Sequence, residues 1–269
     1  MAVGRFFSLL CLFLVVLAPW TEAATKVLVT VVDRDTLEPI TDLKPGELVI
    51  SDGKRTRNVE NVEKVSGLKD VALLIDTSLV GEMVQPAAAN IIENLGEKDQ
   101  MSIVGFDSSA TLLQDFTSSK QLLMGSLENL KYGNSPRIRD AVYATVDGAF
   151  TNTGFRRVVI LLTAGLESGG RVSESRLYRI ARRNQVSVYP VFVSGFRGMF
   201  RDLAEATGAI AVNLPDLAKK TKQGPGELVF QLIDSQYVVT VQGDLGLGEK
   251  TKIELKRPGK YRIGFMEMD

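Results

Sequence analysis

The chain has 269 residues, with 32 basic and 32 acidic side chains, so its formal net charge is zero. This balance argues against a dedicated binder of nucleic acid or anionic membranes, because those partners reward a basic excess. With no histidine, and with Cys11 as its one cysteine, the chain after removal of a leader has no residues for Ser-His-Asp or Cys-His catalysis, for imidazole or thiolate zinc sites, or for haem ligation.

The first residues have the layout of a secretory signal peptide. Arg5 precedes an apolar run over residues 6–17, and small residues follow before Ala23. We therefore predict a signal peptide over residues 1–23, cleaved after Ala23. The run is too short for a membrane span. The sequence thus predicts a secreted or periplasmic product with no membrane span after cleavage.

Residues 24–69 predict an N-terminal β segment. Lys26 to Val32 is rich in valine, Asp33 to Glu38 is an acidic turn, and a further strand from Glu47 to Ile50 ends at Asp52-Gly53. This segment is too small to form a core alone.

Residues 70–216 predict an α/β domain. Val71 to Ile75 is a short apolar run that ends at Asp76, which is typical of a strand buried on both faces of a parallel sheet. Strands and helices then alternate, so the fold class is a Rossmann-like, doubly wound, mainly parallel sheet. A short hairpin over residues 106–111 indicates one antiparallel edge strand. The later expected elements are strands 101–106, 110–116, 158–162, 187–193 and 210–213, and helices 84–95, 119–130, 138–150, 174–184 and 199–206.

Residues 226–269 predict a C-terminal helix and β segment. A helix near residues 228–235 precedes strands 237–241, 252–255 and 261–265. Because each terminal β segment is small, we expect the two to pack together in one sheet or sandwich.

Asp76 and Ser78 follow the central strand, at the sheet edge where such folds bind ligands. Their oxygens are ligands that Mg²⁺ prefers. Asp107 and Asp140 also fall near this edge, so hydrolysis by carboxylates alone stays an alternative. The simpler interpretation is that Asp107 lies in a polar turn and Asp140 complements a helix dipole.

The segment Asp76-Thr77-Ser78-Leu79-Val80 resembles the first metal-site motif, Asp-x-Ser-x-Ser, of von Willebrand factor A (VWFA) domains. Residues 133–142 resemble the second loop of that family, in which Ser135 stands in for a Thr. Residues 161–165, Leu-Leu-Thr-Ala-Gly, resemble a strand end that carries an Asp in the family, where this chain has Ala164. The flanks, residues 39–53, 236–240 and 256–259, resemble bacterial secreted VWFA-related proteins.

The resemblance implies a degenerate metal-ion-dependent adhesion site. Its ligands here are Asp76, Ser78 and Ser135, while Val80 replaces a hydroxyl and Ala164 replaces the second carboxylate. In complete domains of the family, an acid of the bound protein completes the coordination of the ion. With one carboxylate, this chain is expected to need no cofactor, or to hold Mg²⁺ weakly.

We therefore expect an exported, non-enzymatic module that binds another protein or a surface polymer through the loops at the C-terminal edge of the sheet. A structural subunit of an envelope assembly is the main alternative. The sequence does not fix the oligomeric state. The residues expected on this loop rim are Leu79, Val80, Glu82, Asp107, Ser135, Arg137, Leu166, Glu167 and Phe196.

Overall fold

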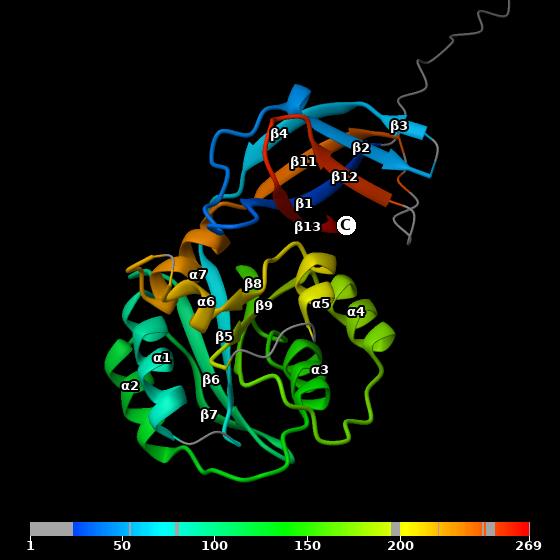
Figure 1. Ribbon diagram of the computed structural model, residues 1–269. Coiled ribbons are helices and arrows are strands. Elements are labelled where there is room, and N and C mark those ends of the chain that lie inside the picture. Colours follow the sequence, from blue (N-terminus) through cyan, green and yellow to red (C-terminus); the bar gives the residue numbers. More distant parts are fainter. Residues whose placement is uncertain are drawn as a thin grey trace, which may run out of the picture.

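The computed structural model describes residues 24–53, 55–78, 81–194, 200–219, 221–243, 245 and 251–268, without the side chains of residues 81 and 82. Figure 1 shows a larger α/β unit with a smaller unit of strands stacked on one end of it. The expected signal peptide, residues 1–23, lies outside the described residues. Within the described ranges, no helix has the length and apolar character needed to cross a membrane.

A six-stranded sheet with the order β10-β9-β8-β5-β6-β7 forms the centre of the α/β unit. Its strands are parallel except for the edge strand β7, which runs antiparallel to β6. The expected fold class, including the antiparallel edge, is confirmed. The bounds are β5 Lys69–Asp76, β6 Gln100–Phe106, β7 Ala110–Thr117, β8 Arg156–Thr163, β9 Val186–Phe192 and β10 Val212–Asn213.

Helices cover both faces of this sheet (Figure 1), with α1, α2, α6 and α7 on one face and α3, α4 and α5 on the other. Serine side chains begin two of them: the hydroxyl of Ser119 accepts from the N–H of Leu122 at 3.4 Å, and that of Ser173 from Arg176 at the same distance. The bounds are α1 Gly81–Glu93, α2 Lys120–Ser126, α3 Ile138–Gly148, α4 Glu174–Arg183, α5 Arg201–Ala206, α6 Leu214–Leu217 and α7 Pro225–Asp234, with 3-10 turns at Pro45–Glu47 and Leu127–Asn129.

Strand β5 lies in the middle of the sheet, between β8 and β6. All the side chains from Val71 to Ile75 are fully buried. A continuous apolar run, without alternation, is what a strand needs when helices cover both of its faces. This confirms the central position that the sequence predicts for the strand ending at Asp76.

The smaller unit is a sandwich of two sheets, with the orders β13-β1-β11-β4 and β12-β2-β3. Strands from both ends of the chain therefore share one sheet, as expected, because β1 pairs with β11 and β13. Side chains such as Val29, Ile50 and Val239 fill the space between the sheets. The bounds are β1 Ala24–Asp33, β2 Leu48–Asp52, β3 Arg55–Arg57, β4 Val59–Lys64, β11 Tyr237–Gln242, β12 Thr251–Leu255 and β13 Tyr261–Met268.

Strand β1 joins the two units because both of its faces are buried. Val27, Val29 and Val31 pack into the core of the sandwich. On the other face, the hydroxyl of Thr30 donates to the carbonyl of Gly208 in the α/β unit at 2.6 Å. Because successive side chains of a strand point to opposite faces, one strand contributes to both cores.

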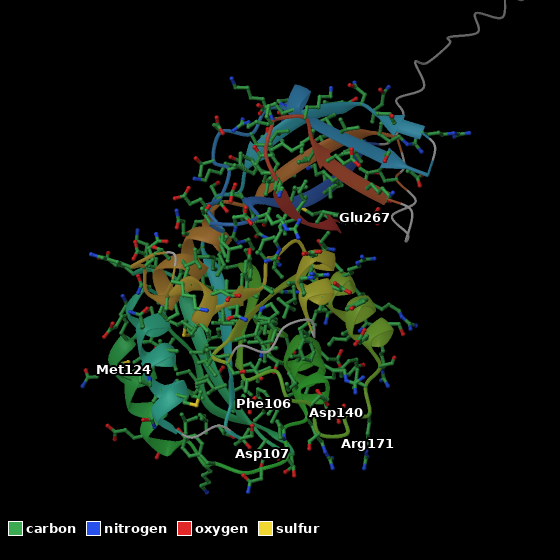
Figure 2. The ribbon with its side chains drawn as sticks, viewed as in Figure 1. Phe106, Asp107, Met124, Asp140, Arg171 and Glu267 are labelled. Atoms are coloured by element: carbon green, nitrogen blue, oxygen red, sulfur yellow. The ribbon has the colours of Figure 1, made fainter. Side chains whose placement is uncertain are left out.

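The sandwich sits at the amino edge of the parallel sheet, since β4 leads directly into the start of β5. The opposite edge carries the loops that follow β5, β6 and β8. Figure 2 shows the labelled residues Asp107, Asp140 and Arg171 at this far pole, away from Glu267 of the sandwich. We call this set of loops, residues 76–78, 107–109, 131–137 and 164–172, the rim.

Two elements differ from expectation. Strands β3 and β4 were not predicted, because charged side chains such as Arg55, Glu60 and Glu63 obscure their pattern. Helix α7, expected to accompany the C-terminal strands, packs instead on α1 of the α/β unit, where the N–H of Gly226 donates to Oδ1 of Asn90 at 3.0 Å. The division of the chain at residues 24–69, 70–216 and 226–269 stays a prediction.

Candidate functional site

Asp76 ends β5 just beneath the rim, and its side chain is fully buried. Its Oδ1 accepts hydrogen bonds from the backbone N–H of Ser78 at 3.0 Å and from the Ser78 hydroxyl at 2.5 Å. Its Oδ2 accepts from the hydroxyl of Thr163 at 2.7 Å and from the N–H of Ala164 at 3.4 Å. Both carboxylate oxygens are therefore occupied by donors of the protein itself, as burial of a charge requires.

Thr163 is the residue of this site that the sequence analysis missed. Its hydroxyl donates to Asp76 and accepts from the N–H of Gly165 at 2.9 Å. The sequence shows only that Asp76 and Thr163 each directly follow a buried apolar run. That the two are neighbours comes from the parallel register, in which Ile75 pairs with Leu162. A hydroxyl at the end of the neighbouring strand is thus placed to reach the acid.

Asp107 follows β6 and holds the loop before α3 in place through hydrogen bonds. Its Oδ1 accepts from the N–H of Ser135 at 2.7 Å, and its backbone carbonyl accepts from the N–H of Arg137 at 2.9 Å. A side chain at Gly133 would overlap the Asp107 carboxylate, which explains a glycine there. The structure thus brings Asp107, Ser135 and Arg137 together, as expected for one rim.

Asp140 and Glu167 hold the fourth loop of the rim, residues 164–172, in place. Oδ1 of Asp140 accepts from the N–H groups of Arg171 at 2.8 Å and Val172 at 2.9 Å. Glu167 accepts from the N–H of Arg139 at 3.1 Å and of Gly170 at 3.0 Å, and its side chain is only 6% exposed. Its carboxylate is therefore directed into the protein.

The predicted rim residues differ in exposure. Leu166 is 59% exposed at the rim, and Ser135 is also exposed. Arg137 is partly buried, and its Nε has no hydrogen-bond partner. Leu79, Val80 and Phe196 lie outside the described residues, as does the side chain of Glu82 at the start of α1.

The donor set beneath the rim fits a tightly held divalent cation poorly. Mg²⁺ in proteins is usually held by carboxylates with waters, and the carboxylate here, Asp76, already accepts from Ser78, Thr163 and Ala164. Among the residues that the structure describes, no group of three acids, histidines or cysteines is arranged to hold a metal. The tentative ligand set of Asp76, Ser78 and Ser135 stays a prediction.

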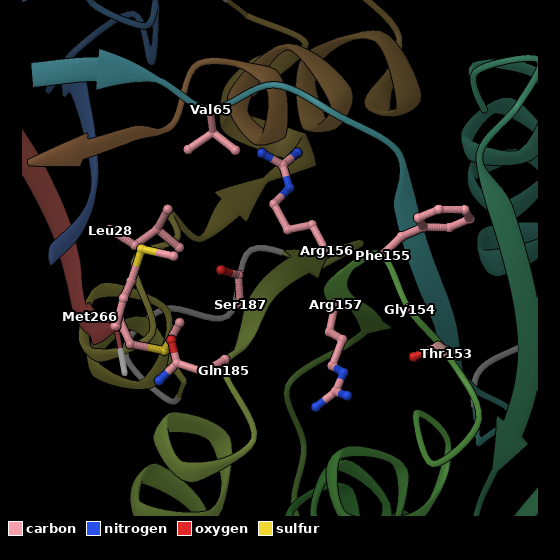
Figure 3. Close-up of a pocket in the computed structure, with 11 residues that line it drawn as sticks. Leu28, Val65, Thr153, Gly154, Phe155, Arg156, Arg157, Gln185, Ser187 and Met266 are labelled. Carbon is pink, nitrogen blue, oxygen red and sulfur yellow. The ribbon is translucent and has the colours of Figure 1, made fainter. Parts of the chain in front are cut away.

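Two cavities lie at opposite edges of the sheet. One, of about 540 Å³, opens beside the rim between the β6–β7 hairpin and the loop before α3, with Thr77, Asp107 and Tyr132 in its wall. Another, of about 420 Å³, lies at the opposite edge of the sheet, where Figure 3 shows Leu28 and Met266 on one side and Arg156 and Arg157 on the other. None of the predicted site residues lines the second cavity, so we assign it no part in the rim.

Comparison with known families shows which protein family the chain belongs to. The profile of the von Willebrand factor type A domain matches residues 70–235, which is more than half of the chain. The chain belongs to the von Willebrand factor type A (VWA) domain family. VWA domains commonly mediate protein–protein interaction or adhesion, and they are generally not enzymes. The search of curated proteins found no match to this VWA protein.

Several solved VWA structures are similar in fold. Proximal thread matrix protein 1 from the mussel byssus matches with 16% identity and a TM-score of 0.51, over 72% of this chain and 51% of that one. A structure of the same mussel protein with a zinc-occupied MIDAS motif matches with 19% identity and a TM-score of 0.51, over 66% and 49%. An aerotolerance-related membrane protein from Bacteroides fragilis matches with 14% identity and a TM-score of 0.48, over 62% and 99%. At these identities the likeness to the two mussel structures shows the fold alone.

Proposed function

We propose that this VWA protein is an exported, non-enzymatic module that binds another protein or a surface polymer through the rim, with weak or no dependence on a divalent metal. The observation that carries the proposal is the state of Asp76. Its two oxygens accept from Ser78, Thr163 and Ala164, so donors of the chain itself already satisfy the acid, which supports weak or no need for an ion.

The rim has the properties of a preorganised binding surface, because its loops are held in place before a partner binds. Backbone N–H groups donate to the side chains of Asp107, Asp140 and Glu167, and these hydrogen bonds tie the loops of residues 107–109 and 164–172 to the loop before α3 and to the first turn of α3. Loops held on a rigid sheet lose little conformational freedom when a partner binds, which favours affinity. Leu166 offers exposed apolar area at the same surface.

Export rests on the leader predicted over residues 1–23. The charge balance of the whole chain, 32 basic and 32 acidic side chains, favours a protein or neutral polymer over nucleic acid as the partner. The VWA family supports binding as the class of function.

A capture experiment tests this function. The mature protein is immobilised and exposed to native envelope extract, with and without EDTA, beside the variants Leu166→Asp and Leu122→Asp. The two leucines are matched in exposure, at 59% and 56%, but Leu122 lies in the first turn of α2, near the amino edge of the sheet.

We expect a partner that is retained in EDTA, lost with Leu166→Asp and kept with Leu122→Asp. Capture that disappears in EDTA would contradict metal independence. Capture that Leu166→Asp leaves unchanged while Leu122→Asp removes it would place the contact away from the rim.

A further inference from the structure

The acidic side chains at the rim have hydrogen-bond partners within the chain, whereas two of its arginines do not. Each of four acids in or next to the rim, Asp76, Asp107, Asp140 and Glu167, accepts at least one backbone N–H of a rim loop. Their carboxylate oxygens are thus already engaged by donors of the rim loops.

Arg137 and Arg171 have no such partners. Over the described residues, neither guanidinium forms an ion pair or a side-chain hydrogen bond, and Nε of Arg137 is buried without an acceptor. The backbone N–H of Arg171 is fixed by Asp140, while its side chain is exposed. Because Nε is buried while the side chain as a whole is only partly buried, an acceptor from outside the chain would meet the terminal guanidinium nitrogens of Arg137.

Both arginines lie where the loop of residues 164–172 meets the start of α3. The N–H of Ser168 donates to the carbonyl of Pro136 at 2.7 Å, which lays the loop of residues 164–172 along the first turn of α3. The N–H of Arg171 reaches Asp140 in the same turn. Figure 2 shows Arg171 and Asp140 together at this pole.

Local helix stability does not explain Arg137. It occupies the N-cap position of α3, where its side chain makes no capping hydrogen bond. Residues with short oxygen-bearing side chains are preferred at this position, and a positive charge near a helix N-terminus opposes the helix dipole. The arginine therefore has an unfavourable position for folding and a favourable one for meeting an anion at the surface.

We infer that the rim receives an acidic side chain, Asp or Glu, of a partner protein directly on the guanidinium of Arg137, with Arg171 beside it and with no bridging metal ion. This inference rests on the proposed function and names the chemistry that the rim recognises. A guanidinium offers a planar fork of N–H donors that matches a carboxylate, so it supplies both charge and orientation. The exposed Leu166 completes the contact with apolar area.

The test uses N-acetyl-glutamate as the probe, with N-acetyl-glutamine as its uncharged match. Each is titrated into the ¹⁵N-labelled mature protein in EDTA while the arginine Nε–H signals are followed by NMR, with assignments from Arg137→Lys and Arg171→Lys. Arg55, an exposed arginine on β3 of the sandwich, is the internal control.

We expect N-acetyl-glutamate to shift the Arg137 signal to saturation, N-acetyl-glutamine to leave it unchanged, and the Arg55 signal to move little. In Arg137→Gln, checked for an unchanged unfolding midpoint, the saturable shift at Arg171 should weaken about tenfold or more, as loss of a charged hydrogen bond predicts. Equal, non-saturating shifts at Arg137 and Arg55, or saturation only with added Mg²⁺, would overturn the inference.

The two proposals fail separately. Partner capture that depends on Leu166 but is unaffected by Arg137→Gln and Arg171→Gln would overturn carboxylate recognition and leave rim binding standing. Capture unaffected by Leu166→Asp and by both arginine variants would overturn the rim as the binding surface, and with it this inference.

Discussion

The hydroxyl of Thr163 donates a 2.7 Å hydrogen bond to Oδ2 of Asp76, joining the ends of the neighbouring strands β8 and β5. The two residues are 87 positions apart in the sequence. Together with Ser78, Thr163 gives the buried acid a full set of donors from the chain itself. The carboxylate that resembles a metal ligand thereby acts as a structural tie beneath the rim.

Thr163→Val should therefore destabilise the protein although it changes the side-chain volume very little. It removes a donor to a buried carboxylate and an acceptor for the N–H of Gly165. The expected loss is about 1–3 kcal/mol of unfolding free energy, measured by urea denaturation. Thr56→Val, at an exposed threonine of β3, is the control and should change stability little. Equal stability of both variants would show that the Asp76 tie contributes nothing.

Ala164→Asp should convert the hydrogen-bonded cluster around Asp76 into a metal site. Ala164 is buried, and its N–H lies 3.4 Å from Oδ2 of Asp76, so the new carboxylate would meet a like charge. In EDTA we expect a loss of about 3–5 kcal/mol. Millimolar Mg²⁺ should restore part of it, because an ion that binds only the folded state raises stability. Ala164→Asn is the uncharged control, and thermal unfolding is the measurement. Rescue of both variants, or of neither, would contradict this account of the site.

Gly264 tests how the sandwich is joined to the α/β unit. A Cβ at this position of β13 would collide with the backbone of Ala209. Gly264→Ala should cost about 1–3 kcal/mol, because backbone must move to accept the methyl group. Gly46→Ala is the control, since no atom lies within 4 Å of its added Cβ. Urea unfolding of the two variants makes the comparison, and a Gly264→Ala protein as stable as Gly46→Ala would refute the close packing of the two units.

Arg257 makes part of the stability depend on pH. Its hydrogen bonds hold the pKa of the Asp42 and Glu47 carboxyls below their ordinary values of 3.8 and 4.5. A lowered carboxyl pKa stabilises the folded state above the ordinary value, and this stabilisation is lost as the pH falls through the lowered pKa. Arg257→Gln should thus melt below wild type at neutral pH, with the difference closing below those values. A difference that persisted unchanged in acid would argue against this ion pair, and Arg55→Gln is the control.

Much of the fold could be predicted because its signals are local. Val71 to Ile75 is apolar without interruption, and this is enough to place β5 at the centre of a parallel sheet. Strand β4 was missed because Glu60, Glu63 and Lys64 are exposed and leave little apolar pattern. Helix α7 was placed with the wrong neighbours because an amphipathic pattern shows that a face is buried but not what covers it.

The candidate site was less predictable because its contacts are not local. The sequence identified Asp76, Ser78, Asp107 and Ser135 as neighbours, and the structure brings them to one edge. The inward direction of Glu167 depends on an N–H of α3, 28 residues away. The bonding of Thr163 depends on strand register. Neither relationship has a periodic signal in the chain.

The most direct test of the central claim is the thermal unfolding midpoint of the mature wild-type protein in EDTA and in millimolar Mg²⁺ or Mn²⁺. Because Asp76 is already satisfied by Ser78 and Thr163, the same midpoint is expected in all conditions. A saturable rise with either ion that Asp76→Asn abolishes would contradict the account, because it would show that the acid binds metal instead of tying the loops.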